Sequence, residues 1–398
     1  MIFGSGAGEN KKIHVVLVNT YRVINSKGGT EKVFCDMANA LSSMGYRVTA
    51  LCADPFDGVA GFNISSSVKF INVGREGKPL FRRGIFKFIR TFSLNRSKRR
   101  NNRERSEFAW KSVLLRREIE YNFQADVYIS FQPETTYMLS RLIGVKSPII
   151  TMFHLEPNIL FAKYSIEMYQ YALRASSLVT VLLPSYIDQV KRICPEASVV
   201  AVPNAIACFE RPAMLKEKKI VCLGRLAEQK RVDLLIKAFA LIKDDIPEWV
   251  VEHWGDIDVE SRYKKKIFRL RKDLGVQDRF RFCGTTDYVE KVLGSASIFA
   301  FPSAWEGFSI ALGEAMAKGL PAVGCIDCSG TNEMITDEVN GLLTVPTPED
   351  FAAALKRLVK NYELRMKLGK KARDDIRKCS PVNIWSQWDN LIQIVAKI

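Results

Sequence analysis

The sequence lacks several features that would place a chain in a class at once. No apolar run in its 398 residues approaches the length of about 18 that a transmembrane helix requires, so we expect no membrane-spanning helix. Residues 1–12 contain no apolar core of a signal peptide, and we expect a short loose leader there. The dinucleotide-binding pattern G-x-G-x-x-G is also missing, which disfavours a dehydrogenase.

Residue types that bind metals are scarce and scattered. The chain has three histidines, far apart in sequence, and nine cysteines without regular spacing. Cys325 and Cys328 form a C-x-x-C pair. A structural zinc site would need further ligands at similar spacing, so we interpret this pair as part of a local loop. Cysteines without a pairing framework are typical of a reduced, cytoplasmic setting.

Composition and charge indicate a globular protein with one unusual segment. Apolar residues make up 47% of the chain and charged residues 26%, and the length allows two domains of ordinary size. The net charge is +16, and much of the excess lies between Arg75 and Arg117, where fifteen Lys or Arg residues accompany three Glu residues. Such a segment attracts polyanions, either nucleic acid or an anionic membrane surface.

Within this segment, the stretch from Leu80 to Phe92 interleaves basic residues with phenylalanines and other apolar residues. A short amphipathic helix lying on a membrane fits this pattern. A helix that packs on its own domain with its arginines in water fits it equally, and the sequence leaves both interpretations open. We expect the polar stretch that follows, Arg96 to Arg105, to be a mobile loop.

Short apolar runs alternate with helical periodicity along both halves of the chain, which is typical of parallel α/β sheets. We therefore expect an α/β fold with two Rossmann-like, doubly wound domains that face each other across a cleft. The expected ranges are residues 1–205 for the first domain with a basic insertion at about 75–117, 206–218 for a linker, 219–380 for the second domain, and 381–398 for a C-terminal helix that packs back on the first.

Candidate ligand contacts follow two predicted strands of the first domain. Gly28 and Gly29 come after the strand Ile13–Asn19 and precede a helix, and His154 ends the strand Pro148–Phe153. Ligands of open α/β sheets bind at the carboxyl ends of strands, so these residues are candidates for ligand contact. The alternatives are a plain turn at the glycines and a core or capping histidine.

In the second domain, residues 301–316 are expected to form a strand end, a turn and a helix, with Ser309 as the N-cap. The amides of Gly307, Phe308 and Ser309 would then be placed to bind an anion. Glu306 and Glu314 flank this site in E-x7-E spacing, about 12 Å apart along the axis if the span is helical. The alternative is that Glu306 caps the helix and Glu314 lies on its solvated face.

Arg225 and Lys230 add cations near the same site. Cations together with backbone N–H donors suit a diphosphate, and carboxylates suit the hydroxyls of a ribose and a hexose. A nucleotide sugar satisfies all of these groups together.

Several motifs, taken in this order, resemble those of family 4 glycosyltransferases. Residues Gly224–Phe239 resemble the family's GR-x4-K signature, and Glu306 to Glu314 matches its E-x7-E motif. Shorter motifs placed as in that family are Gly28–Glu31, Phe282–Gly284 and Asn340–Leu343. The resemblance is strongest over residues 219–345 and looser over 13–205. Two departures are Arg231, where the family commonly has glycine, and the turn Trp254–Asp258.

The resemblance implies a GT-B architecture, a retaining transfer from a nucleotide-diphosphate sugar, and no required metal or cofactor. A UDP-sugar is the first expectation for the donor, and a GDP-sugar is the alternative. Arg225 and Lys230 would neutralise the diphosphate, and Glu314 would hold the ribose. The implied catalytic residues are His154, Arg225, Lys230 and Glu306. The implied donor-binding residues are Gly28, Gly29, Arg225, Lys230, Glu306, Gly307, Phe308, Ser309 and Glu314.

We therefore expect an enzyme that transfers a hexose or an N-acetylhexosamine to a lipid-linked or cell-surface glycan of bacterial type. The loop Gly324–Gly330, which resembles that of enzymes building surface polysaccharides, supports this acceptor class. The enzyme would be cytoplasmic and peripheral, held at the inner face of an anionic membrane by Leu80–Phe92, with no nucleic-acid partner. The alternatives are a nucleic-acid-binding protein that uses the basic segment and a nucleotide-sugar epimerase, although no separate acid/base pair stands out for the latter.

Overall fold

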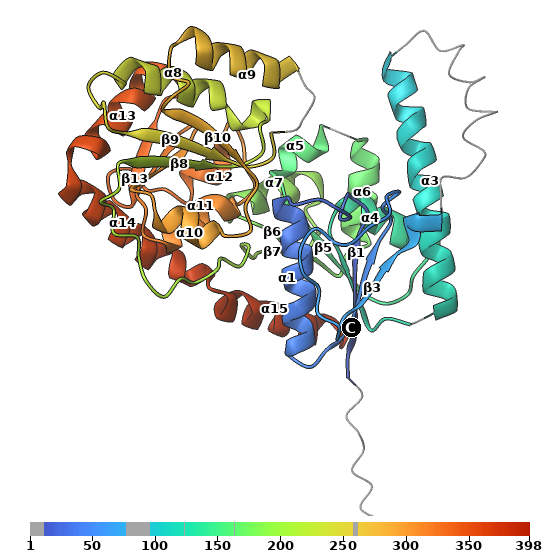
Figure 1. Cartoon of the computed structure of the whole chain (residues 1–398). Helices are drawn as coiled ribbons and strands as arrows, with labels where there is room; N and C mark the ends of the chain where they lie inside the picture. Colours follow the sequence, from blue (N-terminus) through green and yellow to red (C-terminus); the bar gives the residue numbers. More distant parts are fainter. Residues whose placement is uncertain (1–11, 77–95, 123, 163, 258–261) are drawn as a thin grey trace, which may run out of the picture. The chain divides into compact units, whose positions relative to one another are not determined.

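The computed structural model describes residues 12–76, 96–122, 124–162, 164–257 and 262–398 (Figure 1). Contacts divide the chain into two compact units. Unit 1 comprises Met1–Val202 and Trp385–Ile398, and unit 2 comprises Pro203–Ile384. The stretch Leu80–Phe92, which we predict to meet a membrane, lies outside the described residues.

Unit 1 contains a seven-stranded sheet in the order β3-β2-β1-β4-β5-β6-β7, and all of its strand pairs are parallel. The strands are β1 His14–Asn19, β2 Arg47–Cys52, β3 Lys69–Asn72, β4 Val127–Ser130, β5 Ile149–Met152, β6 Leu178–Val181 and β7 Val199–Ala201. Every residue of β1, β4, β5 and β6 is buried, as expected for parallel strands that are covered on both faces.

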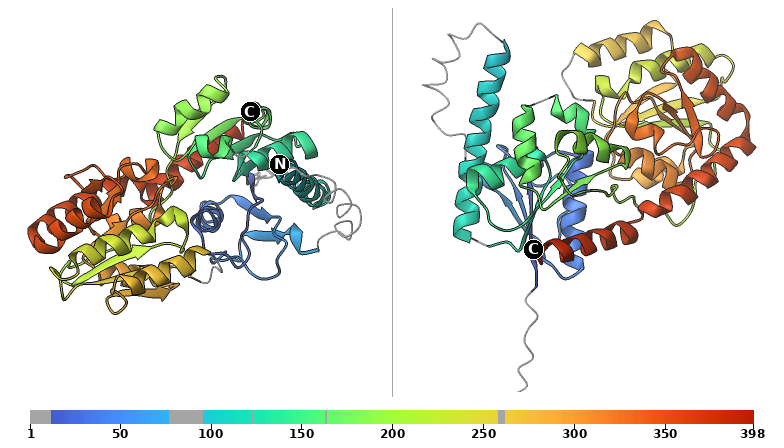
Figure 2. Two further views of the ribbon diagram at one scale, coloured as in Figure 1. Left: turned by 90° about the horizontal axis from the view of Figure 1, so that it is seen from above. Right: turned by 180° about the vertical axis from the view of Figure 1, so that it is seen from behind.

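Helices cover both faces of the unit 1 sheet. They are α1 Gly29–Ser43, α3 Arg96–Asn122, α4 Pro133–Tyr137, α5 Pro157–Phe161, α6 Ile166–Arg174, α7 Ser185–Ile193 and α15 Pro381–Val395, with the short 3-10 helix η1 Val73–Glu76 and the π-helix η3 Met138–Ile143. In both views of Figure 2, α1 (blue) and α3 (teal) lie on opposite sides of the strands. On the α3 side, Leu115 and Ile119 share a core with Val16, Val18 and Tyr128.

The C-terminal helix α15 is assigned to unit 1 from Trp385 onward. Its Asp389 carboxylate accepts a hydrogen bond from the Tyr46 hydroxyl at 2.5 Å, and Gln393 Nε2 donates to the same hydroxyl at 3.0 Å. Trp388 is fully buried, so the helix is held by apolar packing as well as by these polar contacts.

One expectation about the helices of unit 1 is wrong. Residues Arg96–Arg105 belong to α3 and are not a loop, because Arg, Lys and Glu are good helix formers even where no apolar stripe is present. The segment after β5 forms two separate helices, α5 and α6. The Ser165 hydroxyl accepts a hydrogen bond from the Met168 N–H at 3.3 Å, and this N-cap begins a separate helix.

Unit 2 contains a six-stranded parallel sheet in the order β10-β9-β8-β11-β12-β13. The strands are β8 Lys219–Leu223, β9 Val250–Trp254, β10 Phe280–Gly284, β11 Ile298–Phe301, β12 Ala322–Cys325 and β13 Gly341–Thr344. The helices are α8 Val232–Ile242, α9 Arg262–Asp273, α10 Val289–Gly294, α11 Ile310–Ala317, α12 Ser329–Asn332, α13 Pro348–Lys360 and α14 Tyr362–Ile376, with short turns η4 Glu228–Lys230 and η5 Arg377–Cys379.

The core of unit 2 explains its layering. Helices α8 and α13 pack over one face of the sheet, where Phe239 and Leu355 join the core, and α11 packs against α14. The predicted N-cap of α11 is confirmed, because the Ser309 hydroxyl accepts a hydrogen bond from the Leu312 N–H at 3.3 Å. Gly319, just beyond the end of this helix, has a left-handed φ of 77°, a conformation that glycine adopts readily at helix ends.

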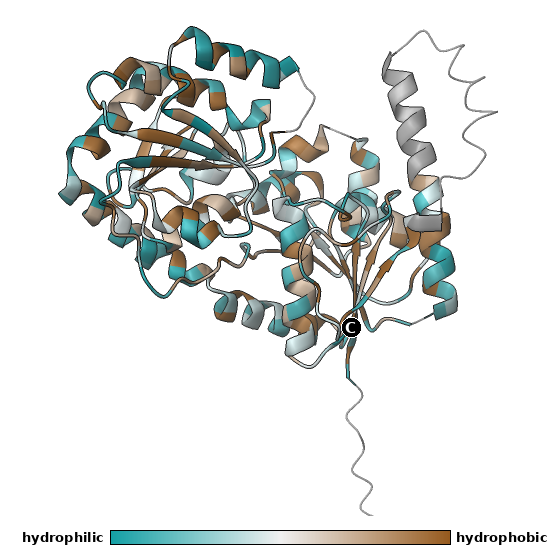
Figure 3. Cartoon of the chain, viewed as in Figure 1, coloured by the Kyte–Doolittle hydropathy of each residue, from teal (hydrophilic) through white to brown (hydrophobic). Residues whose placement is uncertain are grey.

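The predicted α/β class with doubly wound parallel sheets is confirmed for both units. In Figure 3 the strands are predominantly hydrophobic, and polar residues gather on the outward sides of the helices. Among the helices of the described chain, none combines the length and the apolar character that a membrane crossing requires.

Candidate active site

The loop after β8 positions Arg225 by a close approach of two backbones. A Cβ atom on Gly255 would lie 2.0 Å from the carbonyl oxygen of Gly224, so glycine alone fits at this point. The Gly224 N–H donates to the carbonyl of Trp254 at 2.9 Å. Arg225 follows this junction at the carboxyl end of β8 and is exposed, with no hydrogen bond or ion pair to another described residue. Its guanidinium is therefore available to a ligand.

Lys230 and Glu306 form an ion pair at the same edge of the sheet. Lys230 ends η4, which follows β8, and Glu306 lies in the loop after the neighbouring strand β11. The Lys230 Nζ atom is 2.5 Å from Glu306 Oε1, and the two side chains are 17% and 11% exposed. Lys230 and Glu306 belong to separate sequence motifs, and the structure brings them into direct contact.

The N-terminus of α11 lies directly after this pair. Phe308 and Ser309 are nearly buried, and Asn204 Nδ2 donates to the Phe308 carbonyl at 3.1 Å, which fixes the chain as it enters the helix. The first N–H groups of a helix lack carbonyl partners within the helix and carry partial positive charge. Glu314 lies further along α11 and is 8% exposed, so the alternative of a solvated surface position for it does not hold.

Gln229 makes two hydrogen bonds, one as acceptor and one as donor, that hold the loop carrying Glu306. The Gln229 carbonyl accepts from the Ala304 N–H at 2.8 Å, and Gln229 Nε2 donates to the Trp305 carbonyl at 2.6 Å. Gln229 precedes Lys230, so one short turn positions both the cation and the loop of its partner. No pattern in the sequence indicates this contact, because it joins residues 76 positions apart.

In unit 1, Gly28 and Gly29 begin α1 at the carboxyl end of β1. Gly28 is the N-cap and has an extended backbone, with φ −104° and ψ 173°. A Cβ atom on Gly28 would lie 2.4 Å from Glu31 Oε2, and the Ser26 hydroxyl donates to Glu31 Oε1 at 2.8 Å. The carboxylate of Glu31 thus folds back over the start of α1, and Gly28 provides the space for it. The donor contacts predicted for Gly28 and Gly29 stay predictions.

His154 follows β5 at the same edge of the unit 1 sheet. Its ring stacks on Phe131, which follows β4, with centroids 5.0 Å apart and planes 18° apart. The residue as a whole is partly exposed, but its Nε2 atom is buried and has no hydrogen-bond partner. Burial lowers the pKa of His154 to about 4, so the imidazole is neutral at pH 7. A neutral ring donates one hydrogen bond from one nitrogen and accepts one at the other.

A polar network beside His154 was missed in the sequence. Gln132 Nε2 donates to Asn19 Oδ1 at 2.9 Å, and the Tyr21 hydroxyl donates to Glu134 Oε1 at 3.0 Å. Burial and the Glu134 carboxylate raise the pKa of Tyr21 far above its usual value, so it remains a hydrogen-bond donor. Asn19 and Gln132 come at the ends of the apolar runs of β1 and β4. Polar residues at the carboxyl ends of buried strands are the sequence feature that could have identified this network.

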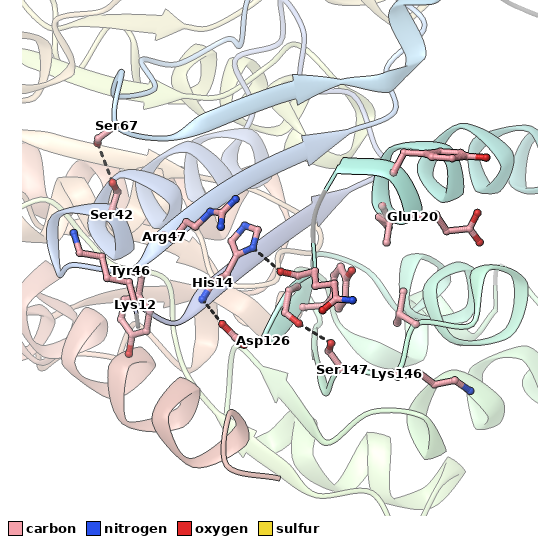
Figure 4. A pocket seen from close by; sticks show the side chains of 16 residues that line it. Lys12, His14, Ser42, Tyr46, Arg47, Ser67, Glu120, Asp126, Lys146 and Ser147 are labelled. Carbon is pink, nitrogen blue, oxygen red and sulfur yellow. Dashed lines mark hydrogen bonds between the residues drawn. The ribbon is translucent and has the colours of Figure 1, made fainter. Parts of the chain in front are cut away.

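A cavity of about 1140 Å³ opens at the opposite, amino edge of the unit 1 sheet (Figure 4). His14 lies in its wall with both ring nitrogens engaged, Nδ1 with the Gln124 carbonyl at 2.8 Å and Nε2 with Thr49 Oγ1 at 2.9 Å. None of the residues that line this cavity in the described chain is a predicted site residue. It is therefore separate from the candidate active site.

Within each unit, the predicted site residues thus lie together at the carboxyl edge of a parallel sheet. In unit 2 these are Arg225, Lys230, Glu306, Gly307, Phe308, Ser309 and Glu314. In unit 1 they are Gly28, Gly29 and His154. Their roles toward a ligand stay predictions. Within the described ranges, no group of three or more His, Cys, Asp or Glu side chains is arranged to hold a metal ion.

Relatives of known class match this chain. Residues 209–375 match the family described as "Glycosyl transferases group 1". An uncharacterized glycosyltransferase of Haemophilus influenzae is 26% identical over 369 residues, which cover 91% of this chain and 94% of that protein. The N-acetylgalactosamine-N,N'-diacetylbacillosaminyl-diphospho-undecaprenol 4-alpha-N-acetylgalactosaminyltransferase of Campylobacter jejuni is 31% identical over 172 residues, which cover 43% of this chain and 45% of that protein.

Solved structures match over nearly the whole chain. Sucrose-phosphate synthase from Thermosynechococcus elongatus has a TM-score of 0.77 and 16% identity, covering 96% of this chain and 99% of that one. HepE of Anabaena, solved in complex with UDP-glucose, has a TM-score of 0.70 and 15% identity, covering 96% and 99%. Likeness at this identity shows the fold. Residues 209–375 therefore form a glycosyl transferases group 1 domain, and the chain is a glycosyltransferase with the GT-B fold.

Proposed function

We propose that this glycosyltransferase is a retaining enzyme that moves a hexose or an N-acetylhexosamine from a nucleotide-diphosphate sugar to a lipid-linked or cell-surface glycan. The observation that carries the proposal is the arrangement at the carboxyl edge of the unit 2 sheet. There, the exposed Arg225, the Lys230–Glu306 pair and the N-terminus of α11 come from the loops after two neighbouring strands.

These groups suit a donor diphosphate. Arg225 and the N–H groups at the start of α11 would donate hydrogen bonds to phosphate oxygens. Lys230 carries three N–H donors, so it can bind a phosphate oxygen while it keeps one bond to Glu306. As the glycosidic bond breaks, negative charge grows on the departing nucleoside diphosphate, and cations fixed beside it stabilise the transition state.

Glu306 holds donor-sugar hydroxyls in this proposal and does not act as a nucleophile. Its carboxylate is engaged by Lys230 at 2.5 Å, which reduces its tendency to attack an anomeric carbon. Retention would then require the acceptor hydroxyl to approach on the face from which the diphosphate departs. Glu314, nearly buried in α11, would accept hydrogen bonds from the ribose hydroxyls of the donor.

In unit 1, His154 would contact the transferred sugar. Stacking on Phe131 orients its ring, and burial keeps it neutral, so it can exchange a hydrogen bond with a sugar hydroxyl. This role follows from the position of His154 at the carboxyl end of β5.

The identities of donor and acceptor are supported by related proteins. The HepE structure contains UDP-glucose, which favours a UDP-sugar over a GDP-sugar as the donor. The Campylobacter enzyme is named for a diphospho-undecaprenol acceptor, which favours a lipid-linked acceptor here. An acceptor of this kind would place the enzyme at the cytoplasmic face of a membrane, with the basic stretch Leu80–Phe92 as its contact.

A transfer assay with product stereochemistry tests the proposal. The full chain would be incubated with UDP-sugars or GDP-sugars and an undecaprenyl-diphosphate-linked acceptor, and the anomeric configuration of the product determined by NMR. We expect release of a nucleoside diphosphate and an anomeric configuration that matches the donor. An inverted product would overturn the retaining mechanism, and transfer from none of these donors would overturn the function. Neither the epimerase nor the nucleic-acid-binding alternative has support from the relatives described above.

A further inference from the structure

Arg231 is a feature of the site that the proposed reaction leaves unused. It directly follows Lys230, and its backbone is left-handed, with φ 43° and ψ 43°. Residues with a side chain seldom adopt this conformation, whereas glycine adopts it readily. A residue in such a conformation persists only when its surroundings hold it there. The contacts of the Arg231 side chain show what holds it.

The Arg231 guanidinium makes two parallel hydrogen bonds to one carboxylate. Its Nη1 atom is 2.9 Å from Asp327 Oδ1, and Nη2 is 2.7 Å from Asp327 Oδ2. This two-point arrangement fixes direction as well as distance, which a lysine could not do. Asp327 lies in the short loop between β12 and α12, so the pair joins that loop to the start of α8.

The same loop region supports Glu306. Gly330, in α12, packs directly against Glu306, because a Cβ atom on Gly330 would lie 2.7 Å from both the Cβ and the carbonyl oxygen of Glu306. Glu306 in turn pairs with Lys230, the neighbour of Arg231. The loops after β8, β11 and β12 are thus linked in a closed ring through Lys230–Glu306, Glu306–Gly330 and Arg231–Asp327.

We propose that Arg231 is a positioning residue. Through Asp327 it fixes the segment on which Glu306 rests, and so it holds the Lys230 and Glu306 charges in the geometry that the donor requires. This inference rests on the proposed function of that pair. It also assigns a purpose to the strained backbone, since a glycine at this position would remove the strain together with the link to Asp327.

The test uses single variants and a reciprocal exchange in the full chain. Arg231→Gly relieves the left-handed backbone but removes the pair, and Asp327→Asn removes the charge. We expect kcat to fall about tenfold in each, since misplacing a catalytic group by about 1 Å can cost a hundredfold. We expect the melting temperature of Arg231→Gly to stay level or rise. The double variant Arg231→Asp with Asp327→Arg should recover most of kcat, because Asp tolerates the left-handed region.

The chain offers a matched control. Glu338 also has a left-handed φ, 61°, and makes a two-point pair with Arg357, at 2.6 Å and 3.0 Å. Glu338→Gly therefore changes backbone strain and an exposed ion pair in the same way, outside the ring of loops. We expect its kcat to match that of the unaltered chain.

Binding of UDP and of GDP, measured by calorimetry on the same proteins, separates the possible failures. An unaltered chain that binds neither nucleotide would overturn the proposed function and this inference together. An unaltered chain that binds and transfers, with Arg231→Gly and Asp327→Asn equally active, would overturn the positioning role alone. Loss of activity in proportion to loss of melting temperature, or equal loss in Glu338→Gly, would also overturn it.

Discussion

Glu314 is nearly buried in α11, where it is 8% exposed. If its carboxylate binds the donor ribose, Glu314→Gln loses a charge-assisted hydrogen bond with little change in shape. We expect donor KM to rise about tenfold, because a hydrogen bond to a charged group contributes roughly 1.5 kcal/mol. Steady-state kinetics with varied donor measures this, and Glu349→Gln, an exposed site on α13, is the control. An unchanged KM would remove Glu314 from the site.

Arg225 and Lys230 allow a second prediction at the scale of single residues. Each would act on charge that grows in the transition state, so Arg225→Ala or Lys230→Ala should lower kcat about a hundredfold at saturating donor. Arg225 has no partner among the described residues, so its loss should leave stability unchanged. Loss of Lys230 removes an ion pair between two largely buried side chains, which are 17% and 11% exposed, and should lower the melting temperature as well.

The control for both is Lys237→Ala, an exposed lysine of α8. Near-normal kcat in both Arg225→Ala and Lys230→Ala, measured at saturating donor, would show that the diphosphate assignment is wrong.

Local signals predicted single residues of unit 2 well, and distant pairings were not predictable. Ser309 could be identified as an N-cap because the capping residue and its partner N–H are three positions apart. The Lys230–Glu306 and Arg231–Asp327 pairs join residues 76 and 96 positions apart, and no periodicity in a single sequence encodes which loops will meet. The departure of Arg231 from glycine was visible, but its partner was not.

At the scale of elements, most strands were predictable, and two of the edge strands were not. Strands such as β1 and β4 are short apolar runs, because parallel strands are covered on both faces. Strand β3 was missed because its residues are exposed or only partly buried, and β13 was missed because Asn340–Gly341 at its start has the composition of a turn. Helix α3 was missed at its start because Arg96–Arg105 has no apolar periodicity.

The basic stretch Leu80–Phe92 provides the prediction at this scale. We expect it to hold the enzyme on anionic lipid, with each basic residue near the surface contributing about 1 kcal/mol and phenylalanines adding a part that resists salt. Changing Arg82, Arg83, Lys87 and Arg90 to Ser should release the protein from anionic vesicles in a flotation assay while transfer to a short soluble acceptor continues.

A charge-matched variant provides the control for flotation. It changes four exposed basic residues of α9 to Ser, namely Arg262, Lys265, Arg269 and Lys272. This variant should float with anionic vesicles as the unaltered chain does. Binding that ignores lipid charge, or binding to DNA with a steeper salt dependence than binding to vesicles, would contradict the membrane assignment.

At the scale of the whole molecule, all three histidines are held in the neutral state. Burial lowers the pKa of His14, and it lowers those of His154 and His253 to about 4. His253 lies in β9, is fully buried, and has no hydrogen-bond partner at either ring nitrogen. In the unfolded chain these groups would titrate near pH 6.5.

The sign of the effect follows from proton binding. Between about pH 4 and pH 6.5 the unfolded state binds more protons than the native state, so the free energy of unfolding rises with pH across this window. The stabilisation is complete above pH 6.5 and is lost as the pH falls toward 4. For His253 alone a shift of this size corresponds to at most about 3 kcal/mol.

We therefore expect the melting temperature of the full chain to fall steadily as the pH is lowered from 6.5 to 4. In His253→Leu the melting temperature should fall less steeply with pH, because this variant removes one titrating group together with two unpartnered nitrogens. His253→Gln separates the two effects, because it also lacks the titration but keeps buried polar atoms that need partners. The melting temperature of His253→Gln should lie below that of the unaltered chain at pH 7, while its pH dependence should be as shallow as that of His253→Leu.

Differential scanning calorimetry over this pH range measures both quantities, and it resolves the two units if they unfold separately. Equal pH dependence in the unaltered chain and in both variants would show that His253 does not titrate on unfolding.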